Sequence, residues 1–227
     1  MPPLLTILVP VYREERTLPT IMSAIAAACP ATHIIYIDDG SDDKSLEILR
    51  TYARPQDTVI ATVHGGKGSA IRQGLAKATG TYTVIQDADL EYDPKEISLL
   101  LQKAQQKPGT AVFGSRFLQP NPNIYKRFLW GNKVMTFCLN LLFNSRITDS
   151  YTCYKLLPTD AFQRLDLQSN GFELEAEICA TCIKAGIPVE EVPISYHPRT
   201  LEEGKKIGFK DAIKGMLMMV KVRLRKS

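Results

Sequence analysis

The sequence predicts an α/β domain with a mainly parallel sheet flanked by helices. Over the first half, short apolar runs rich in β-branched residues alternate regularly with helical segments, and this alternation implies parallel strands joined by right-handed crossovers. Glycines and acidic residues follow these runs directly, at the strand ends where such sheets bind ligands. The chain has 227 residues, of which 44% are hydrophobic, enough for one domain with a substantial core. We therefore expect a single domain over residues 1–227.

In the first half, strands are expected at the apolar runs and helices in the longer segments between them. In chain order, the predicted strands are Leu4–Val11, Ile34–Asp38, Val59–His64, Tyr82–Gln86 and Ala111–Gly114. The predicted helices are Glu15–Ala28, Ser45–Tyr52, Ser69–Ala78 and Pro94–Lys103. After Phe117 the pattern changes, and the predicted elements are a helix at Ile124–Phe143, a polar turn around Asp149, a helix at Phe172–Ala185, a strand at Val189–Tyr196 and a helix at Phe209–Leu224.

The helices at Ile124–Phe143 and Phe209–Leu224 combine apolar and basic residues. The net charge of the chain is only +4, but Asp211 is the one acid among the many lysines and arginines between Lys205 and Lys226. Basic amphipathic helices can bind an anionic membrane surface, and packing helices with solvated basic faces are an equal alternative. No apolar stretch reaches the roughly 18–20 residues that span a bilayer. A strand begins almost at the N-terminus, with no visible signal peptide, which predicts a cytoplasmic protein that can be peripheral on the cytoplasmic face of a membrane.

A run of alternating acids follows the strand predicted at Tyr82–Gln86. Its members are Asp87, Asp89, Glu91 and Asp93. Carboxylates crowded at a strand end repel one another unless a hard cation lies among them, and Mg²⁺ or Mn²⁺ together with a diphosphate is the usual occupant. The competing interpretation is an acidic helix start, with Asp93 as N-cap and Pro94 at the first helical position. Both can hold, which leaves Asp87, Asp89 and Glu91 as candidate metal ligands.

Two other strand ends carry residues that suit a nucleotide. Asp38 and Asp39 end the second predicted strand, where carboxylates can accept hydrogen bonds from a base N–H or from ribose hydroxyls. A turn followed by a helix N-cap is the alternative for this segment. His64–Ala70 follows the third strand, and its glycines would let the backbone approach a phosphate while Lys67 supplies positive charge. The spacing is not that of a Walker A loop.

Taken together in this order, these motifs resemble the family 2 glycosyltransferases of GT-A fold. The resembling segments are VPVYREE, IDDGSDD, GGKGSAIRQGL, QDADLEYDP, GSRF, ITDSYTCYK, FELEAEI and EVPISYHPRTLEEGKKI. More narrowly, the chain resembles the polyprenyl-phosphate (dolichyl-phosphate type) sugar transferases, because PRTLEEGKKI followed by a basic helix is particular to that branch. The resemblance implies a nucleotide-sugar donor, a divalent metal and inversion at the anomeric carbon. It also implies a nucleotide-sugar-binding half at 1–117 and an acceptor-binding half at 118–227.

The resemblance also assigns roles to individual residues. The implied donor-binding residues are Pro10, Tyr12, Glu14, Asp38, Asp39, Lys67, Asp87, Ala88 and Lys205. Asp87, Asp89 and Glu91 would bind the metal. Arg116 and Arg199 would hold anionic oxygens of the donor diphosphate or of an acceptor phosphate, with an ion pair that supports the site as the alternative for Arg116. Asp149 matches an acid that faces the sugar or acceptor, and a structural helix cap is the alternative there.

The expected acceptor is a polyprenyl phosphate. Such a phosphate is already ionised at neutral pH and can attack the sugar C1 directly, so no general base is required. The enzyme must instead bring two anions together, which calls for Mg²⁺ or Mn²⁺ and for guanidinium groups. The chain lacks the carboxy-terminal transmembrane helices of many relatives, so membrane contact would come from the two basic helices or from a membrane partner subunit.

Two other functions are compatible with the sequence. One is a soluble family 2 transferase acting on a hydroxyl of a glycan, a protein or a small molecule, with Asp149 as base. The other is a nucleotide-sugar-binding module without turnover, against which the intact acid run and both arginines argue. UDP- and GDP-sugars are both open as donors, with a slight preference for a UDP-sugar from the loop after the third strand. No nucleic-acid partner is expected.

Overall fold

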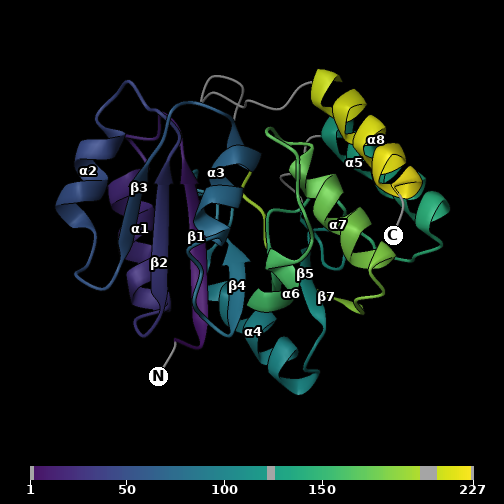
Figure 1. The fold of residues 1–227 in the computed structure, drawn as a ribbon, viewed down its shortest axis with the longest axis horizontal. Coiled ribbons are helices and arrows are strands. Elements are labelled where there is room, and N and C mark those ends of the chain that lie inside the picture. The colour runs from purple at the N-terminus through teal and green to yellow at the C-terminus, as the bar shows by residue number, and fades with distance from the viewer. Residues whose placement is uncertain (1–2, 122–125, 200–208, 226–227) are drawn as a thin grey trace.

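The computed structural model describes residues 3–121, 126–199 and 209–225, without the side chains of 126–128 and 209–210. Its centre is a seven-stranded sheet with the order β3-β2-β1-β4-β6-β5-β7 (Figure 1). The strands are β1 (Leu5–Val11), β2 (His33–Asp38), β3 (Thr58–Ala61), β4 (Tyr82–Ile85), β5 (Ala111–Ser115), β6 (Lys155–Pro158) and β7 (Val189–Pro193). The strands from β3 to β4 are parallel, as are β5 and β7, whereas β6 is antiparallel to both its neighbours. The predicted α/β fold with a mainly parallel sheet is confirmed.

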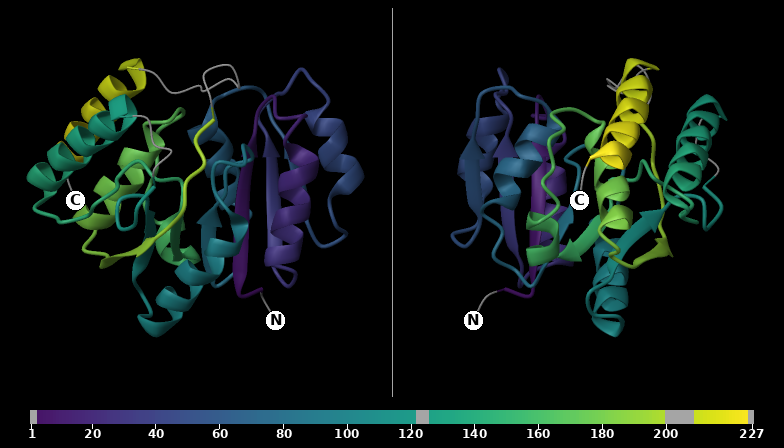
Figure 2. Two further views of the ribbon diagram at one scale, coloured as in Figure 1. Left: turned by 180° about the vertical axis from the view of Figure 1, so that it is seen from behind. Right: turned by 45° about the vertical axis from the view of Figure 1, so that its right-hand side comes forward.

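Helices cover both faces of this sheet. They are α1 (Leu18–Ala28), α2 (Ser45–Tyr52), α3 (Lys67–Leu75), η1 (Pro94–Glu96, a 3₁₀ turn), α4 (Ile97–Gln106), α5 (Lys126–Phe143), α6 (Thr159–Gln163), α7 (Leu174–Lys184) and α8 (Phe209–Leu224). In Figure 1, α3, α6 and α7 lie on the near face, and Figure 2 shows α1 and α4 on the far face. Helix α1 begins three residues later than predicted, with Pro19 in its first turn, a position that suits the fixed φ of proline.

Strand β6 and helix α6 were not predicted. A four-residue strand with lysine first and proline last offers too little alternation to be distinguished from a loop. Because β6 runs opposite to its neighbours, its amino end meets the carboxyl ends of β4 and β5. The segment that precedes β6 is thereby brought to the ligand-binding edge of the sheet.

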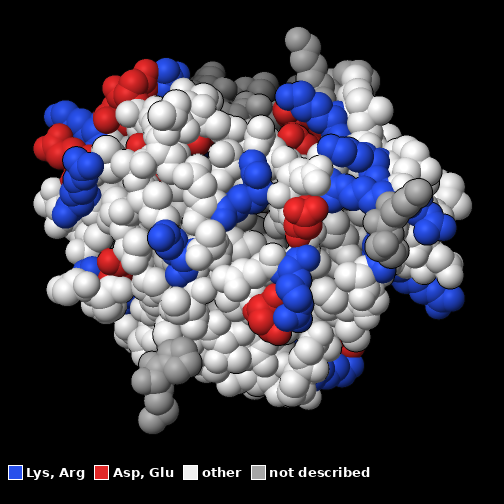
Figure 3. All heavy atoms as spheres, viewed as in Figure 1, with Lys and Arg blue, Asp and Glu red and all other residues white. Residues whose placement is uncertain are grey.

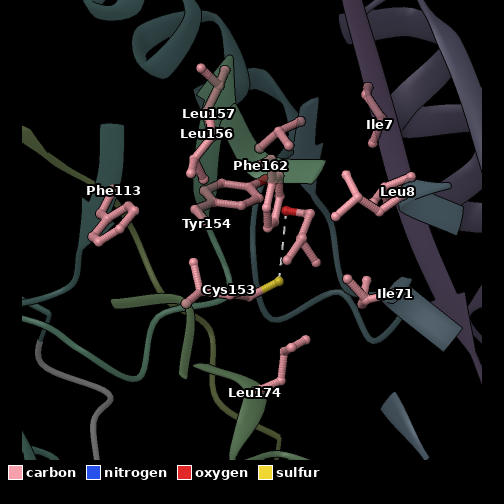
Figure 4. Close-up of a cluster of buried hydrophobic side chains, with 14 of the residues drawn as sticks. Ile7, Leu8, Ile71, Phe113, Cys153, Tyr154, Leu156, Leu157, Phe162 and Leu174 are labelled. Carbon is pink, nitrogen blue, oxygen red and sulfur yellow. Dashed lines mark hydrogen bonds between the residues drawn. The ribbon is translucent and has the colours of Figure 1, made fainter. Parts of the chain in front are cut away.

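The core lies between the sheet and its two helical layers. Figure 4 shows part of the buried cluster, which includes Ile7 and Leu8 of β1, Leu156 of β6 and Phe162 of α6. Cys153 borders this cluster, and its thiol donates a 3.7 Å hydrogen bond to the carbonyl oxygen of Ile85. The apolar core thus extends up to the strand ends that carry the acid run, which fixes their position.

Helices α5 and α8 lie side by side at one end of the molecule, beyond α7 (Figures 1 and 2). Both were predicted, with α8 at the expected bounds and α5 beginning at Lys126; residues 124 and 125 of its predicted range lie outside the described residues. None of the helices in the described part of the chain is long and apolar enough to cross a membrane.

Candidate active site

A cleft of about 330 Å³ opens at the carboxyl ends of β1 and β4. The predicted residues that line it are Pro10, Tyr12, Glu14, Asp39, Lys67, Asp87, Ala88, Asp89, Glu91, Arg116 and Arg199. Asp38 and Asp149 are buried and are not part of the wall, and Lys205 lies outside the described residues. The structure therefore brings together most of the residues that the sequence assigned to one site, from segments far apart in the chain.

A chain of alternating charges runs from the interior to the acid run. The ammonium of Lys67 lies 2.7 Å from Asp87 Oδ1 and 2.8 Å from Glu175 Oε1, and Glu175 also pairs with the fully buried Lys155. Burial alone would lower the pKa of Lys67, but the negative charges, Asp87 foremost, outweigh it and raise that pKa well above its usual value. Burial alone would raise the pKa of Glu175, but Lys155 and Lys67 outweigh it and lower that pKa to about 2. Lys67 is thus held as a cation at the mouth of the acid run.

This lowered pKa makes part of the stability dependent on pH. Since the folded-state pKa of Glu175 lies below the usual 4.5, its contribution is present above pH 4.5 and is lost as the pH falls towards 2. Between pH 5 and pH 3 the loss due to Glu175 amounts to about 2 kcal/mol. Urea unfolding at both pH values measures this loss. On acidification, Glu175→Gln should lose about 2 kcal/mol less stability than the unaltered protein. The exposed-site variant Glu47→Gln should behave like the unaltered protein, and an equal acid loss in all three would contradict the assignment.

Asp89 and Glu91 lie on either side of Leu90, whose φ of +64° is uncommon for a residue with a side chain. Burial, together with the negative charges of Asp87 and Glu91, raises the pKa of Asp89 to about 7. Such crowding is the condition that a divalent cation relieves. Both oxygens of Glu91 already accept hydrogen bonds, 2.8 Å from the backbone N–H of Arg199 and 2.7 Å from the Tyr196 hydroxyl.

The acid run fits a metal ion that is coordinated partly by the protein and partly by the phosphate oxygens of a bound substrate. Across residues 3–121, 126–199 and 209–225, no three His, Cys, Asp or Glu side chains form a site that could hold a metal ion by themselves. Asp87 and Asp89 both face the cleft, and two carboxylates plus phosphate oxygens are the usual way in which proteins hold Mg²⁺. In this structure Glu91 instead anchors the segment that carries Arg199.

Arg199 joins two sides of the cleft. Its guanidinium forms a fork with Glu14, with distances of 3.1 and 2.6 Å, and its Nε donates to the carbonyl oxygen of Asp89 at 2.9 Å. Through these bonds one arginine holds the end of β1 against the acid run. A planar fork of this kind also matches a phosphate, so a ligand phosphate could replace the Glu14 carboxylate.

Arg116 forms a second fork, with Asp149. The guanidinium of Arg116 donates to the two oxygens of Asp149 at 2.7 and 2.8 Å, and the backbone N–H of Arg116 donates to the same carboxylate at 3.1 Å. Asp149 is completely buried. Glu191 holds the loop that carries Asp149, because its carboxylate accepts hydrogen bonds from the backbone N–H groups of Thr148 and Asp149. Arg116 is therefore fixed at the cleft wall from behind.

The glycine loop that follows β3 differs from the expectation. We expected the glycines to let the backbone approach a phosphate. Instead the N–H groups of Gly65 and Gly66 each donate to Asp39 at 2.8 Å, and that of Gly68 donates to the carbonyl oxygen of Asn170 at 2.7 Å. A Cβ on Gly68 would lie 2.3 Å from the carbonyl oxygen of Ser169. These glycines permit close packing of the loop against residues 169–171.

Several cleft residues were not singled out from the sequence. His64 stacks on Tyr12 with ring centroids 4.1 Å apart, which gives this part of the cleft wall an aromatic surface. Cys153 and Tyr196 also line the cleft, and burial raises the pKa of the Cys153 thiol well above its usual value. Cys153 lies just before the unpredicted strand β6 and Lys155 begins it, so no strand pattern pointed to their position.

A search of protein families supports the resemblance. The sequence model described as "Glycosyl transferase family 2" matches residues 6–166. Polyprenol monophosphomannose synthase of Mycolicibacterium smegmatis is 27% identical over 227 residues, which cover 89% of this chain and 80% of that protein. A low-salt glycan biosynthesis hexosyltransferase of Haloferax volcanii is 26% identical, covering 87% of this chain and 48% of that protein. An undecaprenyl-phosphate 4-deoxy-4-formamido-L-arabinose transferase of Photorhabdus laumondii is 34% identical, covering 54% and 39%. The chain thus spans less than half the length of the last two relatives.

Solved structures with the same fold include two sugar-transferring synthases. Glucosyl-3-phosphoglycerate synthase from Mycobacterium tuberculosis, crystallised with Mn²⁺, UDP and glucosyl-3-phosphoglycerate, matches 98% of this chain and 81% of its own with a TM-score of 0.75 at 15% identity. Mannosyl-3-phosphoglycerate synthase from Rubrobacter xylanophilus matches 96% of this chain and 72% of its own with a TM-score of 0.71 at 14% identity. At these identities the likeness shows the fold alone.

Proposed function

Because this chain belongs to glycosyltransferase family 2, we propose that it transfers a hexose from a UDP- or GDP-sugar to a polyprenyl phosphate, with inversion at the anomeric carbon. In this reaction a phosphate oxygen of the acceptor bonds to C1 of the sugar. The bond from C1 to the donor diphosphate breaks, and the nucleoside diphosphate leaves. Two relatives whose names specify a polyprenol or undecaprenyl-phosphate product support this acceptor.

The acceptor assignment rests on one observation: the carboxylates around the cleft are already engaged in ion pairs or hydrogen bonds. A hydroxyl acceptor needs a base that can take up its proton. Asp149, the candidate for that role, is completely buried, and both its oxygens accept hydrogen bonds from the Arg116 guanidinium, through Nε and Nη2. Glu14, Glu91 and Glu175 are likewise engaged by cations or hydrogen-bond donors. Of the other acids in the cleft wall, Asp39 accepts hydrogen bonds from Gly65 and Gly66, and Asp87 and Asp89 are assigned below to a metal ion. A phosphate acceptor is ionised already, so it suits a cleft whose carboxylates are engaged in these ways.

The cations of the cleft suit a reaction between two anions. Lys67, Arg116 and Arg199 all line it, and we assign them to the oxygens of the donor diphosphate and of the acceptor phosphate. Arg199 would exchange Glu14 for a phosphate, while Arg116 stays oriented by Asp149, which we regard as a positioning residue. Lys205 keeps its predicted role as a further phosphate contact.

We assign a Mg²⁺ or Mn²⁺ ion to Asp87 and Asp89, and Glu91 remains a predicted third ligand. When bound there, such an ion would neutralise charge that develops on the leaving diphosphate. Lys67 is paired with Asp87. When Asp87 binds the metal ion, the ammonium group of Lys67 would contact a phosphate oxygen instead.

The nucleoside is assigned to the side of the cleft formed by Pro10, Tyr12 and Asp39. The stacked rings of Tyr12 and His64 offer a surface for a base, because aromatic rings stack on one another. Asp39 fixes the loop that carries His64, and buried Asp38 accepts a hydrogen bond from the backbone N–H of Ser41. Both acids thus shape this part of the cleft, and Ala88, between Asp87 and Asp89, also lines the cleft.

The test is a transfer assay with purified protein and a panel of labelled UDP- and GDP-sugars. Undecaprenyl or dolichyl phosphate in detergent serves as acceptor, with Mg²⁺, Mn²⁺ or EDTA. We expect a lipid-linked sugar that forms only with metal, from one donor of the panel. Donor hydrolysis without a lipid product would contradict the polyprenyl phosphate acceptor and favour transfer to a hydroxyl.

A further inference from the structure

The outward faces of α5 and α8 are apolar, although helices at a protein surface usually turn polar residues outward. The exposed residues are Trp130, Val134, Phe137 and Leu141 on α5 and Ile213, Leu217, Val220 and Leu224 on α8. We call these eight residues the apolar stripes. Their exposed fractions reach 74% at Leu141 and 75% at Leu224, whereas the core residues are at most 8% exposed.

Each stripe follows the helical period. On both helices successive members are four, three and four positions apart, so they lie on one face of each helix. The inward faces carry different residues, among them buried Leu139 on α5 and Met219 and Val222 on α8. The stripes are therefore additional to the packing of these helices. Single exposed apolar side chains are ordinary on protein surfaces, but an ordered group of eight on two neighbouring helices marks a contact surface.

Basic residues flank the stripe on α8. At 100° per residue, Lys214 and Lys221 lie on one side of it and Arg223 on the other, and all three are exposed. Among the described side chains of α5, Lys133 is an exposed cation, and the sequence of this helix contains no acid. Figure 3 shows Lys and Arg side chains gathered over α8. The surface around the stripes therefore has a positive potential.

We propose that the apolar stripes of α5 and α8 insert into the interfacial region of an anionic lipid bilayer, with the flanking lysines and arginine against the headgroups. Apolar burial and attraction to anionic lipid add for a surface of this kind. The charge argues against a second copy of the chain as occupant, because a contact of this face with itself would bring the same cations together. A bilayer supplies both the apolar depth and the complementary charge.

Helix α8 separates the proposed docking face from the cleft, because the buried Gly215 and the apolar stripe lie on opposite sides of this helix. Tyr151 lines the cleft, and its hydroxyl lies so close to Gly215 of α8 that an added Cβ would be 1.6 Å away. If the acceptor is a lipid phosphate, as proposed above, this contact places the catalytic cleft one helix away from the membrane that holds it. Only this step rests on the proposed reaction, because docking itself requires neither donor nor acceptor.

Trp130 reports directly on the proposed insertion, because it belongs to a stripe and is the only tryptophan of the chain. We expect its fluorescence to shift to the blue when the full chain meets vesicles of phosphatidylcholine mixed with phosphatidylglycerol, and to shift little with phosphatidylcholine alone. Flotation should show the same preference, weakened at high salt. No shift and no flotation with anionic vesicles would overturn the proposal.

Three variants separate the stripes from other exposed groups. Phe137→Gln combined with Leu217→Gln should lower vesicle affinity at least about tenfold. Lys214→Gln combined with Lys221→Gln should lower it about as much on anionic vesicles and hardly at all on neutral ones. Tyr52→Gln with Leu99→Gln, which removes exposed apolar groups from α2 and α4, should bind as the unaltered protein does. Equal binding by all variants would overturn the proposal.

Sedimentation without vesicles tests the alternative occupant. Self-association that the stripe variant abolishes, together with a blue shift of Trp130 in the absence of lipid, would assign the face to a second copy and overturn membrane docking. Docking without sugar transfer to lipid would leave this inference standing and contradict the proposed reaction alone.

Discussion

Asp89→Asn should lower sugar transfer by at least about 100-fold while leaving the protein at least as stable as before. Activity falls because the change removes one of two carboxylates assigned to the metal and the diphosphate. Stability does not fall because Asp89 lies among other acids, whose negative charges help raise its pKa to about 7, so a neutral amide relieves repulsion. Transfer rates and thermal unfolding, each with and without Mn²⁺, measure both effects.

The same change at an exposed site provides the control. Asp160 is 70% exposed and pairs with Arg164 on the surface, so Asp160→Asn should alter neither transfer nor the shift of the unfolding temperature with Mn²⁺. In Asp89→Asn that Mn²⁺ shift should disappear. A variant that retains full transfer and the full Mn²⁺ shift would rule out Asp89 as a ligand.

Asp149→Asn should destabilise the fold by about 3–5 kcal/mol. The amide keeps the shape of the side chain but leaves the guanidinium of Arg116 buried without a counter-charge. Removing both charges, as in Asp149→Leu with Arg116→Met, should recover much of this stability, because an apolar pair of similar volume tolerates burial. Urea unfolding measures all three proteins.

A second fork of the same chemistry serves as the comparison. Arg13 and Asp42 are joined by two hydrogen bonds of 2.6 Å, but their side chains are 54% and 65% exposed. Asp42→Asn should change stability little, because solvent screens an exposed pair. Similar losses at the two sites would show that burial does not set the strength of the Asp149 pair.

The parts of the site predicted from sequence are those that follow strand ends. Asp39, Asp87 and Asp89 come after apolar runs, and parallel strands bring such ends to one edge of a sheet, so their convergence required no knowledge of packing. The roles of their neighbours were harder to predict. The loop glycines fit a phosphate and a tightly packed turn equally well in sequence, and only the approach of residues 169–171 distinguishes the two.

The unpredicted parts depend on contacts between distant segments. Lys155 precedes only three more strand residues, so neither its strand nor its burial beside Glu175 produces a local pattern. The fork between Arg116 and Asp149 likewise joins two loops that no periodicity relates. Tertiary packing decides these positions, and one sequence records such packing only weakly.

The insertion of β6 between β4 and β5 also affects how the chain folds as it is synthesised. The parallel strands β1 to β4 can associate as soon as they leave the ribosome. Strand β5 follows them, yet it pairs only with β6 and β7, so it has no partner strand until Pro158 at the end of β6 has been made. During that interval its apolar residues, including Val112 and Phe113, have no partner strand. Nascent chains that end before Pro158 therefore expose an unpaired hydrophobic strand, and such transiently exposed strands are prone to aggregate without chaperones.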